Sequence, residues 1–139
     1  MAEAMQLEIV TPDRLVVRDT AEEVQIPGRS GYLGILPGHA PLITELGVGE
    51  ISYRSSGTIT RLAVAWGFAE VLPDKVTIMA EVSERAQDID VARAQNAKQR
   101  AEEILQSNRP GTNYEEVESA LRRAETRIEV AGRQGQDNH

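Results

Sequence analysis

The chain of 139 residues contains no cysteine, and its only histidines are His39 and the terminal His139. Without cysteine it can form no disulfide scaffold, thiolate metal site or cysteine nucleophile. A two-histidine metal site is not expected, and no nucleophile or carboxylate stands beside His39 at the spacing of a catalytic motif. The glycines form neither a dinucleotide-binding fingerprint nor a phosphate-binding loop. We therefore predict no catalytic residue, no metal site and no required cofactor.

Positive charge and long apolar runs are also scarce. The formal net charge is -7, so the protein repels phosphate backbones and anionic lipid headgroups, and nucleic acid and the bilayer are not expected as direct partners. The first five residues carry neither a basic start nor an apolar run, which argues against a secretory signal or a membrane span. We expect a soluble protein that faces the cytosol.

The composition divides the chain in two. Eight of the eleven glycines and five of the six prolines lie before residue 80, while the stretch from Asp74 to Arg109 has neither. Before Ala86 the apolar residues alternate with polar ones, as in Met5, Leu7 and Ile9, and turn-forming residues separate the segments. A period of two is typical of half-buried strands. We predict a β-sandwich or barrel over residues 1–86.

The second part, residues 87–132, has helical spacing of its apolar residues. Asp88 or Asp90 can cap the first helix, and either Thr112 with Glu115 or Asn113 with Glu116 can form a capping box for the second. Residues 107–111 separate the two helices, so they can pack as an antiparallel hairpin. Gly132 ends the second helix, and we expect residues 133–139 to be a disordered tail.

The apolar stripes of this hairpin are mostly alanine. An alanine buries far less area than the leucine or isoleucine that contributes ~1.5–3 kcal/mol, so the hairpin should dock only weakly. The pattern is equally consistent with a fixed appendage and with a movable one.

Three segments in this order carry a family resemblance. They are Gly34 to Thr44, preceded by Val24 to Gly28 and Gly31 to Leu33; Gly67 to Val71, followed by Lys75 to Ala80; and Ile89 to Ala94, answered by Ala120 to Ile128. Together they resemble the epsilon subunit of bacterial F-type ATP synthases, from about Met5 to Ala131. One departure is Trp66, where relatives often carry a second glycine before Gly67.

This resemblance implies a ten-stranded β-sandwich followed by the helical hairpin. It also implies a non-catalytic subunit of the central stalk, peripheral to the cytoplasmic face of the plasma membrane. The implied partners are the gamma subunit, the ring of c subunits and the alpha/beta hexamer. The implied role is to couple the rotor to the c ring and to inhibit ATP hydrolysis through the hairpin.

The resemblance further assigns the loop from Arg29 to His39 to the contact with the c ring. Its candidate contact residues are Arg29, Ser30, Tyr32, Leu33 and His39. Tyr32 and Leu33 would be exposed apolar groups held by a rigid turn, as interfaces prefer. Without the resemblance, the role expected of His39 is a hydrogen bond that stabilises its loop.

The helices also carry a pattern of arginines. At about 100° per residue, Arg93 and Arg100 fall within roughly 20° of each other, while Arg123 and Arg127 lie one turn apart on the second helix. Folding the hairpin could bring four guanidinium groups towards one groove. The pattern by itself favours solvated ion pairs, each worth ~0.2–0.5 kcal/mol. The resemblance favours a regulatory ATP site at these arginines, with Asp90 and Glu84.

Two other classes of protein fit parts of the sequence. A free-standing β-sandwich that binds a ligand would explain the first 86 residues but not the matched helices. A small hydrolase would need a nucleophile, a base and an orienting residue, and no such set is present. The subunit of a rotary motor is the interpretation that uses both halves of the chain.

Overall fold

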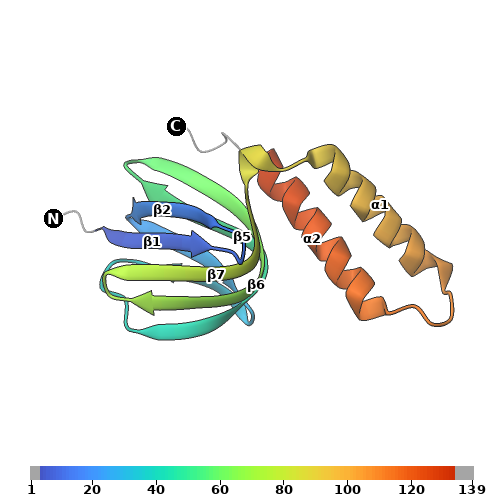
Figure 1. The fold of residues 1–139 in the computed structure, drawn as a ribbon, viewed down its shortest axis with the longest axis horizontal. Helices are drawn as coiled ribbons and strands as arrows, with labels where there is room; N and C mark the ends of the chain where they lie inside the picture. Colours follow the sequence, from blue (N-terminus) through green and yellow to red (C-terminus); the bar gives the residue numbers. More distant parts are fainter. Residues whose placement is uncertain (1–3, 134–139) are drawn as a thin grey trace.

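The computed structural model describes residues 4–133, which form a β-sheet domain followed by two long helices (Figure 1). The strands are β1 Met5–Val10, β2 Leu15–Ala21, β3 Glu23–Gly28, β4 Gly31–Ile35, β5 Leu42–Ser55, β6 Thr58–Leu72 and β7 Lys75–Arg85. A short 3₁₀ helix, η1 Ala86–Asp88, leads to α1 Val91–Ser107 and α2 Tyr114–Gly132.

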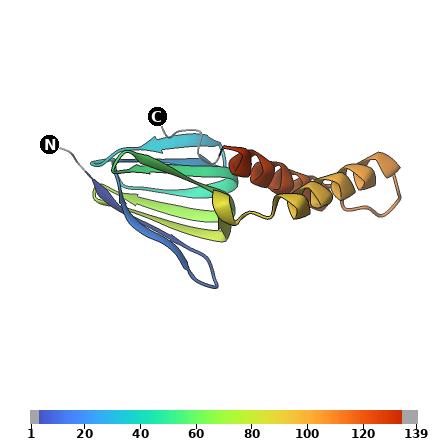
Figure 2. The ribbon, with the colours of Figure 1, turned by 90° about the horizontal axis from the view of Figure 1, so that it is seen from above.

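The described strands hydrogen-bond in one sheet with the order β2-β1-β7-β6-β5-β3-β4. Strands β1 and β7 run parallel, and the other neighbouring pairs are antiparallel. All seven strands contribute buried side chains to one apolar cluster. The sheet therefore folds over this core, as the views in Figures 1 and 2 show. The prediction of a β-sandwich before Ala86 is confirmed.

The sheet bends where β5, β6 and β7 lie side by side. In β6 the buried core positions change from Leu62 and Val64 to Ala69 and Val71, so the inward face shifts by one residue between them. Trp66 lies at this shift with φ 58°, and Gly67 follows with φ 123°. A side chain at Gly67 would collide with the Met79 carbonyl oxygen, so the close approach of β6 and β7 requires glycine there.

The expected number of ten strands is wrong, because seven form the described sheet. Strands β5, β6 and β7 have 14, 15 and 11 residues, and they continue through the bend instead of ending at it. A strand that passes the corner unbroken belongs to both layers of the sandwich. The glycines at 47 and 49, which the sequence suggested as a turn, lie inside β5, so the chain changes direction at the bend without leaving the strand.

The helix caps resolve the alternatives that the sequence left open. The Asp90 side chain accepts a hydrogen bond from Arg93 N at 3.1 Å, so Asp90 caps α1. The Asn113 side chain accepts one from Glu116 N at 3.2 Å and caps α2. Arg133, which we assigned to the tail, instead follows α2 directly as its C-cap. The other predicted tail residues, 134–139, lie outside the described ones.

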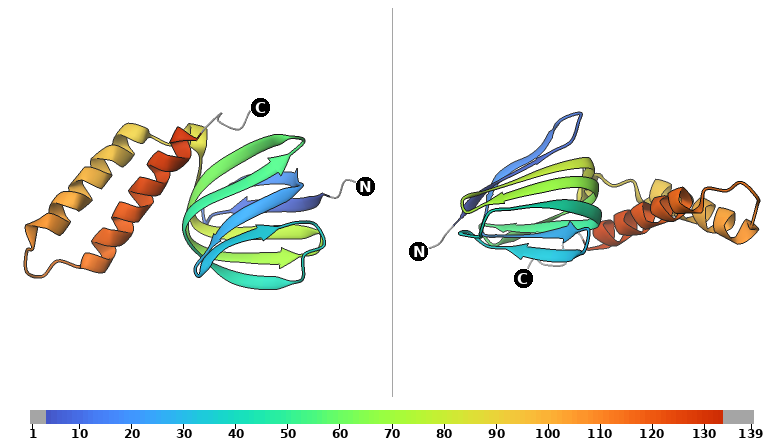
Figure 3. Two further views of the ribbon diagram at one scale, coloured as in Figure 1. Left: turned by 180° about the vertical axis from the view of Figure 1, so that it is seen from behind. Right: turned by 90° about the horizontal axis from the view of Figure 1, so that it is seen from below.

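The two helices form the expected antiparallel hairpin (Figure 3). Helix α2 packs against β5, β6 and η1, and α1 packs against α2 on the side away from the sandwich. The buried residues of the described helices are Ala94, Ala101, Ala124 and Val130. Figure 2 also shows the β1–β2 connection, in blue, projecting from the rest of the sandwich.

Candidate functional site

The hairpin joins the sandwich through a small apolar contact. Val130 of α2 is 1% exposed and lies in a cluster with Ala63, Ala86 and Ile89. Ala131 packs against the edge of this cluster. The cluster is separate from the main core of the sandwich, and Val130 is the one fully buried side chain that α2 contributes to it. A contact with so few buried apolar side chains costs little free energy to open.

The predicted site residues Glu84, Arg123 and Arg127 lie together beside this contact. Arg127 Nε donates to Glu84 Oε1 at 2.5 Å, and Arg123 Nη1 donates to Ser119 Oγ at 2.9 Å. All three residues line a small cavity between α2 and the outer face of β5, β6 and β7. Its volume of about 10 Å³ corresponds to roughly one water molecule. In this conformation the guanidinium groups use the protein's own oxygens as acceptors.

The predicted residues on α1 are placed differently. Asp90 uses its carboxylate as the helix cap. Arg93 and Arg100 are exposed, and their side chains make no hydrogen bond or ion pair with any residue in the range 4–133. No two of the four arginines share a partner among the described residues. The structure thus brings Glu84, Arg123 and Arg127 to one cavity, while Asp90, Arg93 and Arg100 do not line it.

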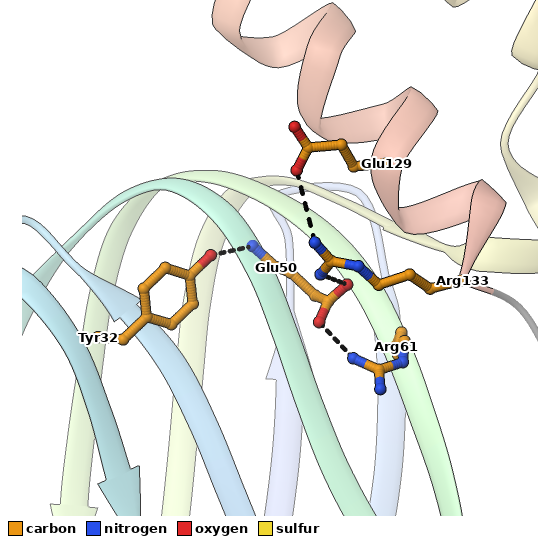
Figure 4. Close-up of polar contacts among 5 residues, drawn as sticks. All are labelled: Tyr32, Glu50, Arg61, Glu129 and Arg133. Atoms are coloured by element: carbon orange, nitrogen blue, oxygen red, sulfur yellow. Dashed lines mark hydrogen bonds and ion pairs between the residues drawn. The ribbon is translucent and has the colours of Figure 1, made fainter. Parts of the chain in front are cut away.

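A second group of charges, which the sequence did not predict, lies at the end of α2 (Figure 4). Glu50 accepts hydrogen bonds from Arg61 Nη1 at 2.6 Å and from Arg133 Nη1 at 2.9 Å. Arg133 also lies 3.7 Å from Glu129, and the Glu50 backbone N–H donates to Tyr32 Oη at 2.9 Å. Glu50 is shielded, with 11% of its side chain exposed. The group ties the end of the hairpin to β5 and β6.

The segment expected as one contact loop, residues 29–39, is a strand with a turn at each end. Arg29 and Ser30 form the turn between β3 and β4, and Arg29 Nη1 pairs with Glu45 Oε2 at 2.6 Å. Tyr32 is exposed on β4, as predicted. Leu33 is half-buried and packs against the main core, so the expectation that it is exposed is wrong.

His39 lies at the other end of β4. Its Nδ1 is 2.7 Å from the Ala40 carbonyl oxygen, a local hydrogen bond of the kind that the sequence suggested. The neighbouring Gly38 N–H donates to Pro73 O in the β6–β7 turn, and the adjacent Asp74 O accepts from the start of β1. Arg29, by contrast, lines a cleft of about 670 Å³ with Trp66 and the first half of α2. The two turns therefore belong to different surfaces.

The outer face of the sheet beyond the bend carries exposed apolar side chains. Phe68 and Met79 are cross-strand neighbours, with exposed fractions of 50% and 45%. Together with Trp66, Val10 and other residues, they line a cleft of about 550 Å³ beside the projecting β1–β2 connection. An apolar face of this kind is typical of a surface that binds another protein. The alternation in β6 could have indicated it, because Phe68 lies out of phase with Ala69 and Val71.

Two further properties concern the described residues only. Neither α1 nor α2 has the length and apolar character that a membrane crossing requires. Within residues 4–133, no three histidine, aspartate or glutamate side chains gather in a way that could hold a metal ion.

Comparison with known protein families covers both parts of the chain. Residues 4–86 match the family model described as ATP synthase, Delta/Epsilon chain, beta-sandwich domain, and residues 87–132 match the one for its long alpha-helix domain. The chain belongs to the ATP synthase delta/epsilon chain family. The resemblance stated from the sequence is confirmed.

Bacterial relatives within the family can be aligned with most of the chain. It is 44% identical over 136 residues to the ATP synthase epsilon chain of Geotalea daltonii, covering 97% of this chain and 99% of that one. It is 68% identical over 110 residues to the epsilon chain of Koribacter versatilis, covering 79% and 78%. A chain of the Euglena gracilis mitochondrial ATP synthase, solved as OSCP/F1/c-ring, has a TM-score of 0.79 at 22% identity over 91% of this chain and 79% of that chain. This last similarity concerns the fold.

Proposed function

We propose that this chain is the epsilon subunit of a bacterial F-type ATP synthase and serves in its central stalk without catalysing a reaction itself. The observation that carries the proposal is the match of both parts, in order, to a family whose bacterial relatives are named ATP synthase epsilon chain. Its partners are the gamma subunit, the c ring and the alpha/beta hexamer. The subunit is peripheral, at the cytoplasmic face of the plasma membrane.

The sandwich supplies the contacts to the rotor. The exposed Phe68 and Met79 offer an apolar surface to a protein partner. The turn at Arg29 and Ser30, with Tyr32, is one candidate contact with the c ring, and the loop at His39 is a separate one. These turns lie at opposite ends of β4.

The hairpin supplies the regulation. It is attached by one small apolar cluster and ion pairs near the end of α2, and α1 contributes no residue to that cluster. Such an attachment allows the hairpin to leave the sandwich and extend along gamma, where it restrains rotation in the hydrolysis direction. The arginines of the released hairpin can then meet acidic surface on the beta subunits.

Deletion of residues 88–139 tests this role in the assembled enzyme. We expect the ATPase rate to rise while proton coupling is retained, because the sandwich keeps its contacts with the rotor. The matched control is the assembled enzyme with the intact chain, purified in the same way. An ATPase rate that is the same with and without the hairpin, at every nucleotide concentration, would contradict the regulatory role.

ATP is the ligand proposed for the hairpin, through Arg93, Arg100, Arg123 and Arg127, with Asp90 and Glu84. A polyphosphate accepts several charge-assisted hydrogen bonds at once, and arginine presents a fork of donors suited to it. The side chains of Arg93 and Arg100 have no hydrogen-bond or ion-pair partner within the described residues, whereas Arg127 would exchange Glu84 for phosphate. Binding to the docked hairpin alone stabilises it by about 1.4 kcal/mol when ATP exceeds the Kd roughly tenfold.

Calorimetry on the full chain tests ATP binding directly. Arg93→Ala and Arg127→Ala should each weaken binding, and Arg18→Ala, on the exposed face of β2, is the matched control. The proposed ATP site would be rejected if no heat change were seen at millimolar ATP, or if neither substitution changed the binding. The arginines would then be explained as members of solvated ion pairs.

A further inference from the structure

Three residues form a row across the outer face of the sheet where α2 docks. Glu50 of β5 is the register partner of Ala63 in β6, and Ala63 is the partner of Glu84 in β7. Because directly opposed residues of neighbouring strands point to the same face, two carboxylates flank one methyl group. The row Glu50, Ala63 and Glu84 is thus acidic at its ends and apolar in its centre.

Helix α2 and its cap present the complementary set. Arg127, Val130 and Arg133 are spaced three residues apart, and each meets one member of the row. Arg127 Nε is 2.5 Å from Glu84 Oε1, and Arg133 Nη1 is 2.9 Å from Glu50 Oε1. Val130 packs in the cluster that contains Ala63. The row on the sheet is acidic, apolar and acidic, and the facing positions on the helix are basic, apolar and basic.

The spacings on the two elements agree. Adjacent strands lie ~4.8 Å apart, so β5 and β7 are separated by roughly 9.6 Å. Six residues of α-helix rise about 9 Å, which is the axial distance from Arg127 to Arg133. Within residues 114–133 no other pair of arginines is six residues apart. A helix shifted by one turn would therefore lose at least one of the two ion pairs.

The pair at Glu50 is better shielded than an ordinary surface pair. The Glu50 side chain is 11% exposed, against 44% for Arg133, and its second oxygen is held by Arg61 Nη1 at 2.6 Å. Arg61 lies on β6 and holds the Glu50 carboxylate, and Tyr32 lies on β4 and accepts from the Glu50 backbone N–H, so neither contact involves α2. Preorganised, partly desolvated pairs are screened less by salt than exposed ones.

We propose that this row and triplet form an ionic lock that fixes the docked register of the hairpin and sets how readily it is released. The inference rests on the proposed function only in taking the hairpin to be movable. Glu50 and Arg133 are then positioning residues of the docked state, outside the proposed nucleotide site. Glu84 and Arg127 are shared between the lock and that site.

Thiol labelling of the full chain measures the lock without any partner protein. The chain has no cysteine, so Ala86→Cys introduces a single thiol in the buried cluster beneath Val130. Its rate of reaction with Ellman's reagent follows the fraction of time that the hairpin is undocked. In this background, Arg133→Gln and Glu50→Gln should each raise the rate about threefold to tenfold, the range expected for a partly exposed, charge-assisted contact.

The double variant and a control decide the outcome. If Glu50 and Arg133 act on each other, Glu50→Gln with Arg133→Gln labels no faster than the faster single variant. Arg18→Gln breaks an ion pair between β1 and β2, and should leave the rate within about twofold. Should Glu50→Gln also disturb the sandwich, a lowered melting temperature reveals it, and Arg133→Gln at the helix end decides alone.

Two results would overturn the lock: a rate unchanged by Arg133→Gln, or effects of the two substitutions that simply multiply. Either one leaves hairpin-dependent inhibition untouched, because deletion of residues 88–139 in the assembled enzyme tests it separately. Conversely, a lock confirmed by labelling, together with an ATPase rate that ignores the hairpin, would reject the regulatory function alone.

Discussion

The sandwich and the hairpin are stabilised in different ways. The sandwich encloses one core to which all seven described strands contribute, and its large side chains, such as Leu7, Ile51 and Ile78, are fully buried. The described helices bury three alanines and one valine. Burial on this scale holds a sandwich together but leaves a hairpin dependent on a few specific contacts. The difference suits a protein with one rigid part and one part that rearranges.

The largest expected effect tests this contrast with the same substitution in both parts. Ile78→Ala removes a side chain that is 0% exposed and should lower the free energy of unfolding by about 2–5 kcal/mol. Ile104→Ala, at a position on α1 that is 37% exposed, should cost less than about 1 kcal/mol. Urea unfolding followed by circular dichroism measures both. Equal losses would mean that the hairpin is an integral part of the core.

A smaller effect is expected at the contact between the two parts. Val130→Ala removes the main apolar group of α2 from the cluster with Ala63 and Ile89, and should weaken docking by about 1–2 kcal/mol. Hydrogen exchange of the Ile89 amide, which donates to Ala86 O at 3.3 Å, should accelerate. The amides of the sandwich core should keep their protection, because that core does not include Val130.

Val91→Ala is the matched control for this substitution. Val91 is 38% exposed at the start of α1 and is not part of the cluster. Its replacement should leave exchange at Ile89 unchanged. If both substitutions accelerate exchange equally, helix stability rather than docking limits the motion.

The sequence predicted those features that depend on local pattern. Alternation in β1 marked Met5, Leu7 and Ile9 as core residues, and the structure buries all three. Asp90 and Asn113 were each one of two cap candidates in the sequence, because a cap needs only a polar side chain and a free N–H three residues on, and the structure chose between them.

The bend and the lock could not be predicted in this way. Trp66 adopts φ 58°, which a bulky residue accepts only where the surrounding sheet imposes it. Glu50 and Glu84 lie 34 positions apart in the sequence, and only the registers of β5, β6 and β7 place them in one row. Arg133 follows Gly132, which is a frequent end of a helix, and so it was assigned to the tail. These features depend on which residues of neighbouring strands lie opposite each other, and the sequence pattern does not determine that register.

The smallest expected effect concerns Tyr53, a titrating group in the core of the sandwich and not in the contact with the hairpin. Burial raises the pKa of Tyr53 above its usual 10.0, and the nearby Asp19 carboxylate acts in the same direction, against Thr60 and Arg85. The folded protein therefore holds the phenol proton more tightly than the unfolded chain. This contribution to stability is complete below pH 10 and is lost as the pH rises through the raised pKa.

Tyr53→Phe isolates that contribution. At neutral pH the variant should lose about 0.5–1.5 kcal/mol, because Tyr53 Oη donates to Asp19 Oδ2 at 3.3 Å. Above pH 10 the free energy of unfolding of the wild type should approach that of the variant, since only the wild type must ionise a buried phenol. Urea titrations at pH 8 and pH 11 give the difference. Because Tyr53 lies in the main core and not in the docking cluster, exchange at Ile89 should be the same in both proteins at pH 8. If the difference in stability is the same at pH 8 and pH 11, Tyr53 has the same pKa in the folded and unfolded protein. If the exchange rate at Ile89 changes, docking of the hairpin depends on packing in the main core.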